Sequence, residues 1–227
     1  MFSLEKSVED KEVKLSMKYF TKQWLDDIRS QPYSSEFHDY LSELIDKGNS
    51  FEQAEDLLLK HIEQQRQMNI YSPQQVHWEY LRHYKQIRHS LTEGIRNIAD
   101  RDSLHDCLIE DIHFCGENLC IKFYENRITT GREMLSSVDL TGYKSDLFFM
   151  SKLTFIFAKI LKDEISPKIG MKAKTAAWCW CLHSEVYVHQ DSYEVHILAS
   201  TGTNVRDSGL SEIIISFKDV VIEIEER

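Results

Sequence analysis

The residue types most able to do chemistry stand close together between residues 178 and 185. Alternate side chains of a β-strand point to opposite faces, so four ligand-type residues are expected to share one face: Cys179, Cys181, His183 and Glu185. Thiolate, imidazole and carboxylate groups all bind zinc, and same-face neighbours lie about 6.5–7 Å apart at Cα. Structural zinc sites usually include a Cys-x-x-Cys turn, which is absent here. We therefore favour small, half-buried thiols and keep the four residues as a candidate metal site.

Two other groups of polar residues form a candidate polar cluster: His105, Asp106, Glu194 and His196. A His-Asp dipeptide supplies metal ligands in a class of helical phosphohydrolases, but here it stands where helical periodicity gives way to strand periodicity. We favour a local role in which Asp106 anchors the chain as it enters the sheet. Glu194 and His196 share a strand face, either as an acid/base pair or, as we favour, as a structural hydrogen bond.

Two further stretches allow a functional and a structural interpretation. Cys115 and Cys120 flank a turn, where a redox pair is conceivable, but no neighbouring cation or helix N-terminus would lower a thiol pKa. The segment 77–96 mixes basic and aromatic residues in a way that can grip single-stranded nucleic acid. Its aromatic residues Trp78 and Tyr84 fall on the apolar stripe of a helix, so we interpret them as core residues.

Several motifs of enzymes are absent. The eight glycines are scattered singly, so the sequence has neither a glycine-rich phosphate loop nor a dinucleotide-binding fingerprint. It also lacks a Gly-x-Ser-x-Gly elbow, a His-Glu-x-x-His pair and a calcium loop. The sequence therefore predicts no catalytic residue, no cofactor and no metal beyond the candidates above.

The elements that would position these residues change character along the chain. Residues 17–102 have helical periodicity, with a helix expected over 21–29 after the Phe20/Leu25 hydrophobic staple. A second helix, capped by Ser34 or Ser35, carries Phe37, Tyr40, Leu41, Leu44 and Ile45 on one face. A third follows a Ser50/Gln53 capping box, with Phe51, Ala54, Leu58 and Ile62 as its core stripe. One long helix is then expected from Ser72-Pro73 to Ile98.

Residues 103–227 show the two-residue periodicity of β-strands. We expect strands on both sides of a turn at 116–118, a covered strand over 153–160, a hairpin of 176–189 with 193–200, and one or two strands over 210–225. This pattern predicts an α+β fold in which the helical lobe, 17–102, packs on a mostly antiparallel β lobe, 103–227.

Composition limits the classes of partner. The chain of 227 residues has 27 Lys and Arg against 37 Asp and Glu, a net charge of −10. Such a charge disfavours binding to nucleic acid or to an anionic membrane. No apolar run approaches the roughly 18 residues of a membrane span, and the first residues do not resemble a secretory signal. The five cysteines are then expected to be reduced thiols of a cytoplasmic protein.

The string Met17-Lys18-Tyr19-Phe20-Thr21-Lys22, with Trp24, resembles the opening of a family of uncharacterised proteins of spore-forming Gram-positive bacteria. The resemblance continues in the segments 104–106, 193–198 and 217–219. It implies a bacterial cytosolic protein of unassigned activity and supplies no site residue. It also fits a second expectation, that residues 1–16 are either a disordered arm or a mis-called start before Met17.

These observations favour a non-catalytic module that binds a protein or a ligand over an enzyme. An acidic, compact chain of this kind can associate with a basic protein partner through charge. The alternative is a metal-dependent hydrolase that uses some of His105, Asp106, His183, Glu185, Glu194 and His196 on the β lobe. The sequence identifies neither the partner nor the oligomeric state.

Overall fold

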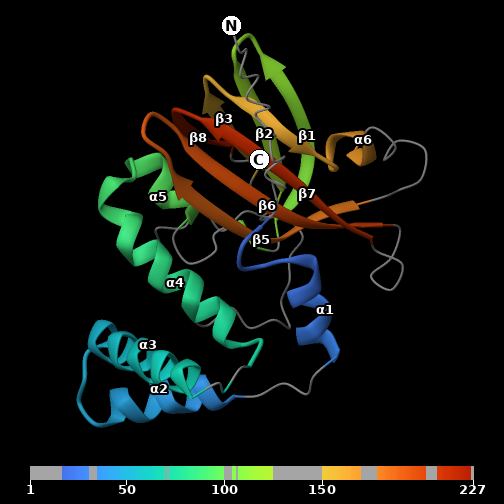
Figure 1. Ribbon diagram of the computed structural model, residues 1–227. Helices are drawn as coiled ribbons and strands as arrows, with labels where there is room; N and C mark the ends of the chain where they lie inside the picture. Colours follow the sequence, from blue (N-terminus) through green and yellow to red (C-terminus); the bar gives the residue numbers. More distant parts are fainter. Residues whose placement is uncertain are drawn as a thin grey trace, which may run out of the picture.

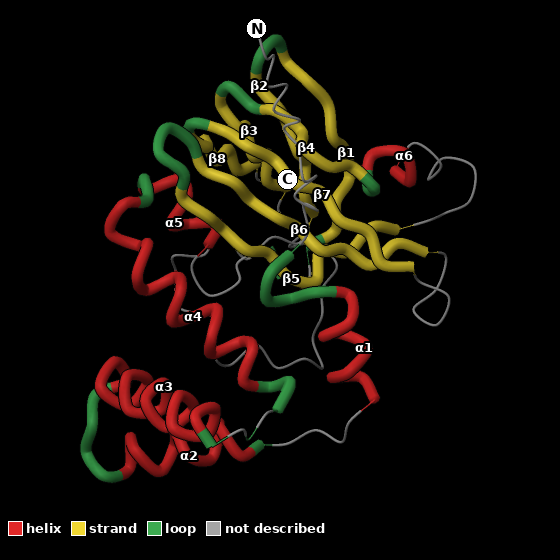
Figure 2. Tube along the Cα trace, in the orientation of Figure 1, coloured by secondary structure: helices red, strands yellow, loops and turns green. Residues whose placement is uncertain are grey.

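The structure is a computed structural model and describes residues 17–30, 35–68, 70, 72–99, 104–105, 107–124, 150–169, 178–202 and 209–225. Helices α1–α5 form the N-terminal half of the described chain, and an antiparallel sheet fills most of the C-terminal half (Figures 1 and 2). The expected α+β fold is therefore confirmed. The segment 1–16 lies outside the described residues. Among the residues described, no helix is both long enough and apolar enough to cross a bilayer.

The helical segments of the N-terminal half are α1 (Lys22–Ser30), α2 (Glu36–Asp46), α3 (Phe51–Gln67), α4 (Gln75–Ile87), the 3₁₀ turn η1 (Arg88–Ser90) and α5 (Glu93–Ala99). The first begins as predicted. The Trp24 N–H donates to the Thr21 hydroxyl, and both residues of the staple, Phe20 and Leu25, are buried. Helix α1 packs on the sheet through a small apolar cluster that includes Trp24, Tyr80 and Leu198.

Helices α2 and α3 form a hairpin with its own apolar core, to which Trp78 of α4 contributes. The capping box is confirmed, since the Gln53 N–H donates to the Ser50 hydroxyl and the Ser50 N–H donates to the Gln53 side chain. Two predicted core residues are wrong: Ile45 is 40% exposed and Phe51 is 55% exposed. Both stand beside the turn, where the two helices no longer cover each other.

The predicted long helix over 72–98 is also wrong, because the chain breaks between α4 and α5. Leu91 is extended, and Thr92 starts a new helix by accepting from the Ile95 N–H and, with its carbonyl, from the Arg96 N–H. The break divides the predicted apolar stripe between α4 and α5, which pack on different partners. Trp78 packs on the α2–α3 hairpin, whereas Ile98 packs on the sheet.

The described strands are β1 (Leu108–Cys115), β2 (Asn118–Tyr124), β3 (Met150–Ile156), β4 (Lys159–Asp163), β5 (Trp178–Val188), β6 (Tyr193–Gly202), β7 (Gly209–Phe217) and β8 (Asp219–Glu225). A short helix, α6 (Ser166–Ile169), follows β4. The sheet order is β4-β7-β6-β5-β1-β2-β3-β8, with every neighbouring pair antiparallel. The predicted strand over 153–160 is interrupted at Phe157, whose φ is +49°.

The two strands at the ends of this order, β4 and β8, directly follow β3 and β7 in the chain. Strand β3 leads into β4 after two residues, and β7 leads into β8 after Lys218. Because β3 pairs with β8 and β4 pairs with β7, the long segments 150–163 and 213–225 lie side by side. A hydrogen bond from the Lys218 N–H to the Ile156 carbonyl joins the two ladders at the bend. The sheet therefore curls and closes on itself in the manner of a barrel.

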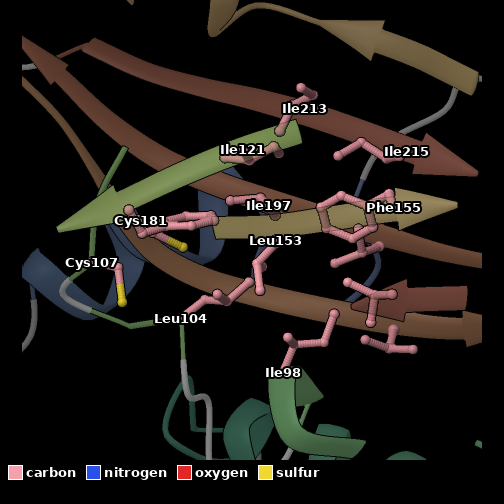
Figure 3. Packing of buried hydrophobic residues seen from close by; sticks show 14 of the residues in the cluster. Ile98, Leu104, Cys107, Ile121, Leu153, Phe155, Cys181, Ile197, Ile213 and Ile215 are labelled. Atoms are coloured by element: carbon pink, nitrogen blue, oxygen red, sulfur yellow. The ribbon is translucent and has the colours of Figure 1, made fainter. Parts of the chain in front are cut away.

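The inside of the closed sheet forms the main core. Apolar side chains from opposite strands meet there, as Figure 3 shows for Ile121, Phe155, Ile197, Ile213 and Ile215. Helix α5 covers one side of this core and approaches β8 closely. A Cβ atom on Gly94 would stand 2.1 Å from the Val220 carbonyl oxygen, so the contact requires glycine.

Candidate functional site

The four residues of the candidate metal site do not share one face of β5. Cys181 pairs with Ala199 and His183 pairs with Leu198, so the register shifts by one residue at Leu182. Such a bulge sends the following side chains to the opposite face. The expectation from strict alternation is therefore wrong.

The two cysteines of this segment point into the main core. Cys179 and Cys181 are buried among apolar residues of the closed sheet, and Figure 3 shows the Cys181 sulfur there. His183 and Glu185 lie on the outer face instead, beneath the segment 17–20 and helix α4. The bulge thus separates the sulfur ligands from the imidazole and carboxylate ligands, which fits the interpretation of these cysteines as small hydrophobes.

Glu185 is fully buried and holds the segment before α1 against the sheet. Its Oε1 accepts the N–H groups of Tyr19 (2.7 Å) and Phe20 (2.6 Å), and its Oε2 accepts the Lys18 N–H (2.9 Å). The Tyr187 hydroxyl donates to the same Oε2. A carboxylate has four lone-pair sites, and all four are used here. Glu185 is therefore occupied as a structural anchor.

Helix α4 covers the adjoining edge of β5. The Val186 N–H donates to the Tyr80 hydroxyl at 2.9 Å, and the Val186 carbonyl lies 3.2 Å from His83 Nε2. Burial lowers the pKa of His83 below its ordinary value. Burial, together with the Glu185 carboxylate, raises the pKa of the Tyr187 hydroxyl. The lowered pKa favours a neutral His83 ring beside the Val186 carbonyl, and the raised pKa favours the protonated Tyr187 hydroxyl that donates to Glu185.

His105 and His183 are in contact, a point that the sequence alone could not decide. Their ring centroids are 5.1 Å apart, and His183 also stacks on Phe20 at 4.6 Å and contacts the Trp24 ring edge at 5.0 Å. Asp106 lies outside the described residues. The surroundings of His183 are therefore mainly aromatic, which indicates that its imidazole ring serves in packing.

Glu194 and His196 also meet, at the far end of the same outer face. Glu194 lies between two imidazoles, 3.0 Å from His189 Nε2 and 3.1 Å from His196 Nε2. His196 is buried against the Tyr187 ring, and its Nδ1 has no hydrogen-bond partner among the described residues. The predicted polar cluster thus forms two separate contacts, His105 with His183 and Glu194 with His196, along one packed face.

The basic residues of the segment 77–96 are largely committed to the α2–α3 hairpin. Arg82 forms an ion pair with Glu63, and Lys85 pairs with Glu55 (3.1 Å) and Asp56 (2.9 Å). Trp78 and Tyr84 are buried, as predicted. Neutralised in this way, the two cations hold α4 to α3 and offer little to a phosphate backbone.

A different set of residues forms the group of ligand-type atoms closest to the geometry of a metal site. His113, Cys115 and Cys120 each place one nitrogen or sulfur atom within 4.8 Å of the others, and no further such group occurs among the described residues. Cys115 and Cys120 were singled out from the sequence, but His113 was missed. The alternation Asp111-x-His113-x-Cys115 before a short turn is the signal that could have found it.

A surface hollow of about 300 Å³ lies outside the segment that Glu185 anchors, with Lys18, Trp24, Asp27 and Glu79 among its lining residues. It does not reach His183 or His196. Comparison with protein-family models, with curated proteins and with solved structures found no match for this chain. The resemblance to a family of spore-forming bacteria therefore stays a prediction.

Proposed function

We propose that this chain is a non-catalytic binding module of the bacterial cytoplasm whose partner is a protein with a basic surface. The turn between α2 and α3 is the proposed contact surface. The observation that carries the proposal is the exposure there of Ile45 and Phe51, two apolar side chains whose positions in the helical pattern are those of core residues. We call these two residues the hairpin tip.

The hairpin stands apart from the sheet. Helix α4 runs between the sheet and the α2–α3 pair, which lies on its far side (Figure 1). The apolar cluster inside the hairpin contains residues of α2, α3 and α4 alone among those described. A partner could therefore contact the hairpin tip without displacing any part of the closed sheet.

The charge of the hairpin matches a basic partner. The segment 36–67 contains eight acidic and three basic residues, a net charge of −5. Three of its acidic residues, Glu55, Asp56 and Glu63, are paired with Lys85 and Arg82 of α4, so the charge open to a partner comes from the other acidic residues. Asp46 and Glu52 directly flank the two exposed apolar residues and are themselves exposed. An apolar centre with a charged rim is the usual arrangement of a protein–protein contact, in which the rim charges speed association.

The outer face of β5 and β6 supports a non-catalytic role. Glu185 uses all of its acceptor sites on backbone and tyrosine donors, and His183 is packed among aromatic rings. The alternative prediction, a metal-dependent hydrolase built on these residues, would need them around a common ion. Among the residues described, that grouping occurs only at His113, Cys115 and Cys120, which lie on other strands.

The proposal is tested by recovering a partner from the source organism at low salt and measuring its affinity with purified components. We expect a basic protein whose binding weakens at least about tenfold in the Phe51→Ser variant, because an apolar anchor at an interface commonly contributes about 2 kcal/mol or more. The matched control is Phe157→Asn, which removes another exposed phenylalanine, 61% exposed, from the sheet. Asparagine is chosen because it tolerates the positive φ of this position.

Two outcomes would contradict the proposal. One is the recovery of no basic partner at low salt. The other is a partner whose affinity is unchanged by Phe51→Ser but reduced by Phe157→Asn, since its contact surface would then lie on the sheet. Elemental analysis of the same complex tests the hydrolase alternative separately, because that alternative requires a metal that is lost when His183 or Glu194 is substituted.

A further inference from the structure

The hairpin of β1 and β2 gathers three metal-binding side chains on one face. Asp111, His113 and Cys115 alternate along β1 and therefore share one face, and on β2 Cys120 pairs directly with His113. The turn is as short as a hairpin allows, since Cys115 pairs with Asn118. Two residues from one strand therefore meet a third from the next.

The geometry is close to that of a tetrahedral site. The three ligand atoms lie within 4.8 Å of one another, and ligands on one tetrahedral zinc ion stand about 3.4–3.8 Å apart. Rotation about χ1 of Cys115, whose side chain is exposed, would shorten these separations. Cys120 is buried, so one thiol is already shielded from water.

His113 carries the outer partner that zinc-bound histidines usually have. Its Nδ1 lies 2.7 Å from Asp111 Oδ2, which orients the ring, so that Nε2 would be the ligand atom in the proposed site. A carboxylate on the second ring nitrogen orients a metal-bound imidazole and raises its basicity. This arrangement is an observation independent of the spacing of the three ligands.

The scaffold around the hairpin is firmly held. The Asn118 side chain accepts the Phe157 N–H at 3.0 Å, and the Glu117 carbonyl accepts the Ala158 N–H at 2.9 Å. The turn is thereby tied to the bend between β3 and β4. Ligands on such paired strands are positioned more accurately than ligands on a free loop.

The donor types suit a thiophilic metal ion. Thiolate and imidazole are the ligands that zinc sites in proteins use most. When such an ion binds, it displaces the thiol protons of Cys115 and Cys120 into solvent, so binding is expected to release protons.

We propose that His113, Cys115 and Cys120 bind one Zn²⁺ ion, with Asp111 as the partner of His113 and a fourth position open to solvent. The site lies on the outer face of the sheet, on strands that contribute nothing to the hairpin tip. It is thus independent of the proposed protein contact. Its donor set of two thiolates and one imidazole selects a thiophilic ion over Mg²⁺ or Ca²⁺.

The test uses the full chain, purified without a metal-affinity tag and stripped with a chelator under reducing conditions. Zn²⁺ alone is then titrated, and Co²⁺ serves as a spectroscopic probe. We expect about one Zn²⁺ per chain and the intense visible absorption of tetrahedral thiolate-bound Co²⁺. Cys115→Ser is the main variant because Cys115 is exposed and its loss leaves the core intact. It should lose at least about 100-fold in Zn²⁺ affinity, more than the 10–100-fold typical for loss of an outer partner.

Cys179→Ala is the matched control, since it removes a thiol from the main core, and it should bind Zn²⁺ as the unmodified chain does. Asp111→Asn should weaken binding about 10–100-fold while keeping one Zn²⁺ per chain at saturation. Three results would overturn the proposal: no Zn²⁺ bound by the reduced chain, binding unaffected by Cys115→Ser, or a Co²⁺ spectrum of octahedral type.

Discussion

At the scale of single residues, Glu185 shows how a reactive side chain is used for structure. Its carboxylate lies 165 or more positions along the chain from the three N–H groups that it accepts. Those N–H groups belong to the segment before α1, where no helix or strand supplies partners. A buried backbone N–H without an acceptor costs about 1–3 kcal/mol, so this single carboxylate stabilises the whole entry of the chain.

The Glu185→Gln variant tests this role. An amide can accept at one oxygen only, and its NH₂ group would face backbone donors, so we expect the free energy of unfolding to fall by about 3 kcal/mol. Urea denaturation measures the change. Glu223→Gln, which removes an exposed ion pair with Lys152, is the control and should change stability by less than about 1 kcal/mol. Equal effects of the two variants would refute the anchoring role.

His83 gives stability a dependence on pH. Burial lowers its pKa from 6.5, with Lys18 acting in the same direction and Glu185 in the opposite one. The unfolded chain therefore takes up a proton more readily than the folded chain. The contribution to stability is complete above about pH 6.5 and is lost as the pH falls below that value.

The matched variant is His83→Gln, whose side-chain amide can still donate to the Val186 carbonyl but does not titrate. Between about pH 7.5 and 5.5, its free energy of unfolding should fall less than that of the unmodified chain. Urea denaturation at several pH values gives both slopes. Equal slopes of the free energy of unfolding against pH for the two proteins would contradict this, because His83 would then have the same pKa in the folded and unfolded chains.

At the scale of elements, α5 depends on a close approach to β8. A Cβ atom at position 94 would clash with the Val220 carbonyl, which belongs to the backbone and cannot rotate away. Gly94→Ala should therefore lower the melting temperature despite the better helix propensity of alanine, with a loss of about 1–3 kcal/mol. Glu93→Ala, at an exposed neighbouring position, should change stability by less than about 0.5 kcal/mol. A neutral or stabilising effect of Gly94→Ala would mean that α5 sits farther from β8.

Local signals in the sequence predicted elements well where the interactions themselves are local. The Ser50/Gln53 capping box links residues three positions apart, and the staple of Phe20 with Leu25 links residues five apart. The bulge at Leu182 could not be predicted, because it is set by the register of β5 against β6 and by what covers each face. The break at Leu91 could not be predicted either, because it allows α4 to pack on the α2–α3 hairpin and α5 to pack on the sheet.

The two misplaced core residues have a related cause. A helical stripe predicts which side of a helix is apolar but not how far a neighbouring helix extends over it. Ile45 stands at the end of α2 and Phe51 at the start of α3, on the two sides of the connecting turn. Their exposure thus depends on how far the two helices extend over each other, and the proposed function depends on this exposure.

At the scale of the whole molecule, charge and apolar exposure coincide in one unit. Reversing two charges with Asp46→Lys/Glu52→Lys should reduce the association rate with a basic partner and weaken its salt dependence. Glu117→Lys/Glu223→Lys makes the same change in net charge on the sheet and should have a smaller effect. Stopped-flow or surface-based kinetics at several salt concentrations distinguish the two. Equal effects would mean that net charge alone guides association.

The closed sheet fits the proposed use of the hairpin for binding. Hydrogen bonding between the segments 150–163 and 213–225 covers the edges that these segments present to each other, and α4 covers part of the adjoining edge of β5. Covering strand edges in this way reduces unwanted strand pairing. The hairpin on the far side of α4 is then the part of the described chain best placed to meet another protein.

The most direct measurement is hydrogen exchange of the backbone amides with and without the recovered partner. The account predicts that the partner slows exchange in the segment 36–67, most strongly around the turn between α2 and α3, and leaves β5 and β6 unchanged. Slower exchange along β5 and β6, with α2 and α3 unaffected, would contradict it, because the partner would then bind the face that carries His183 and His196.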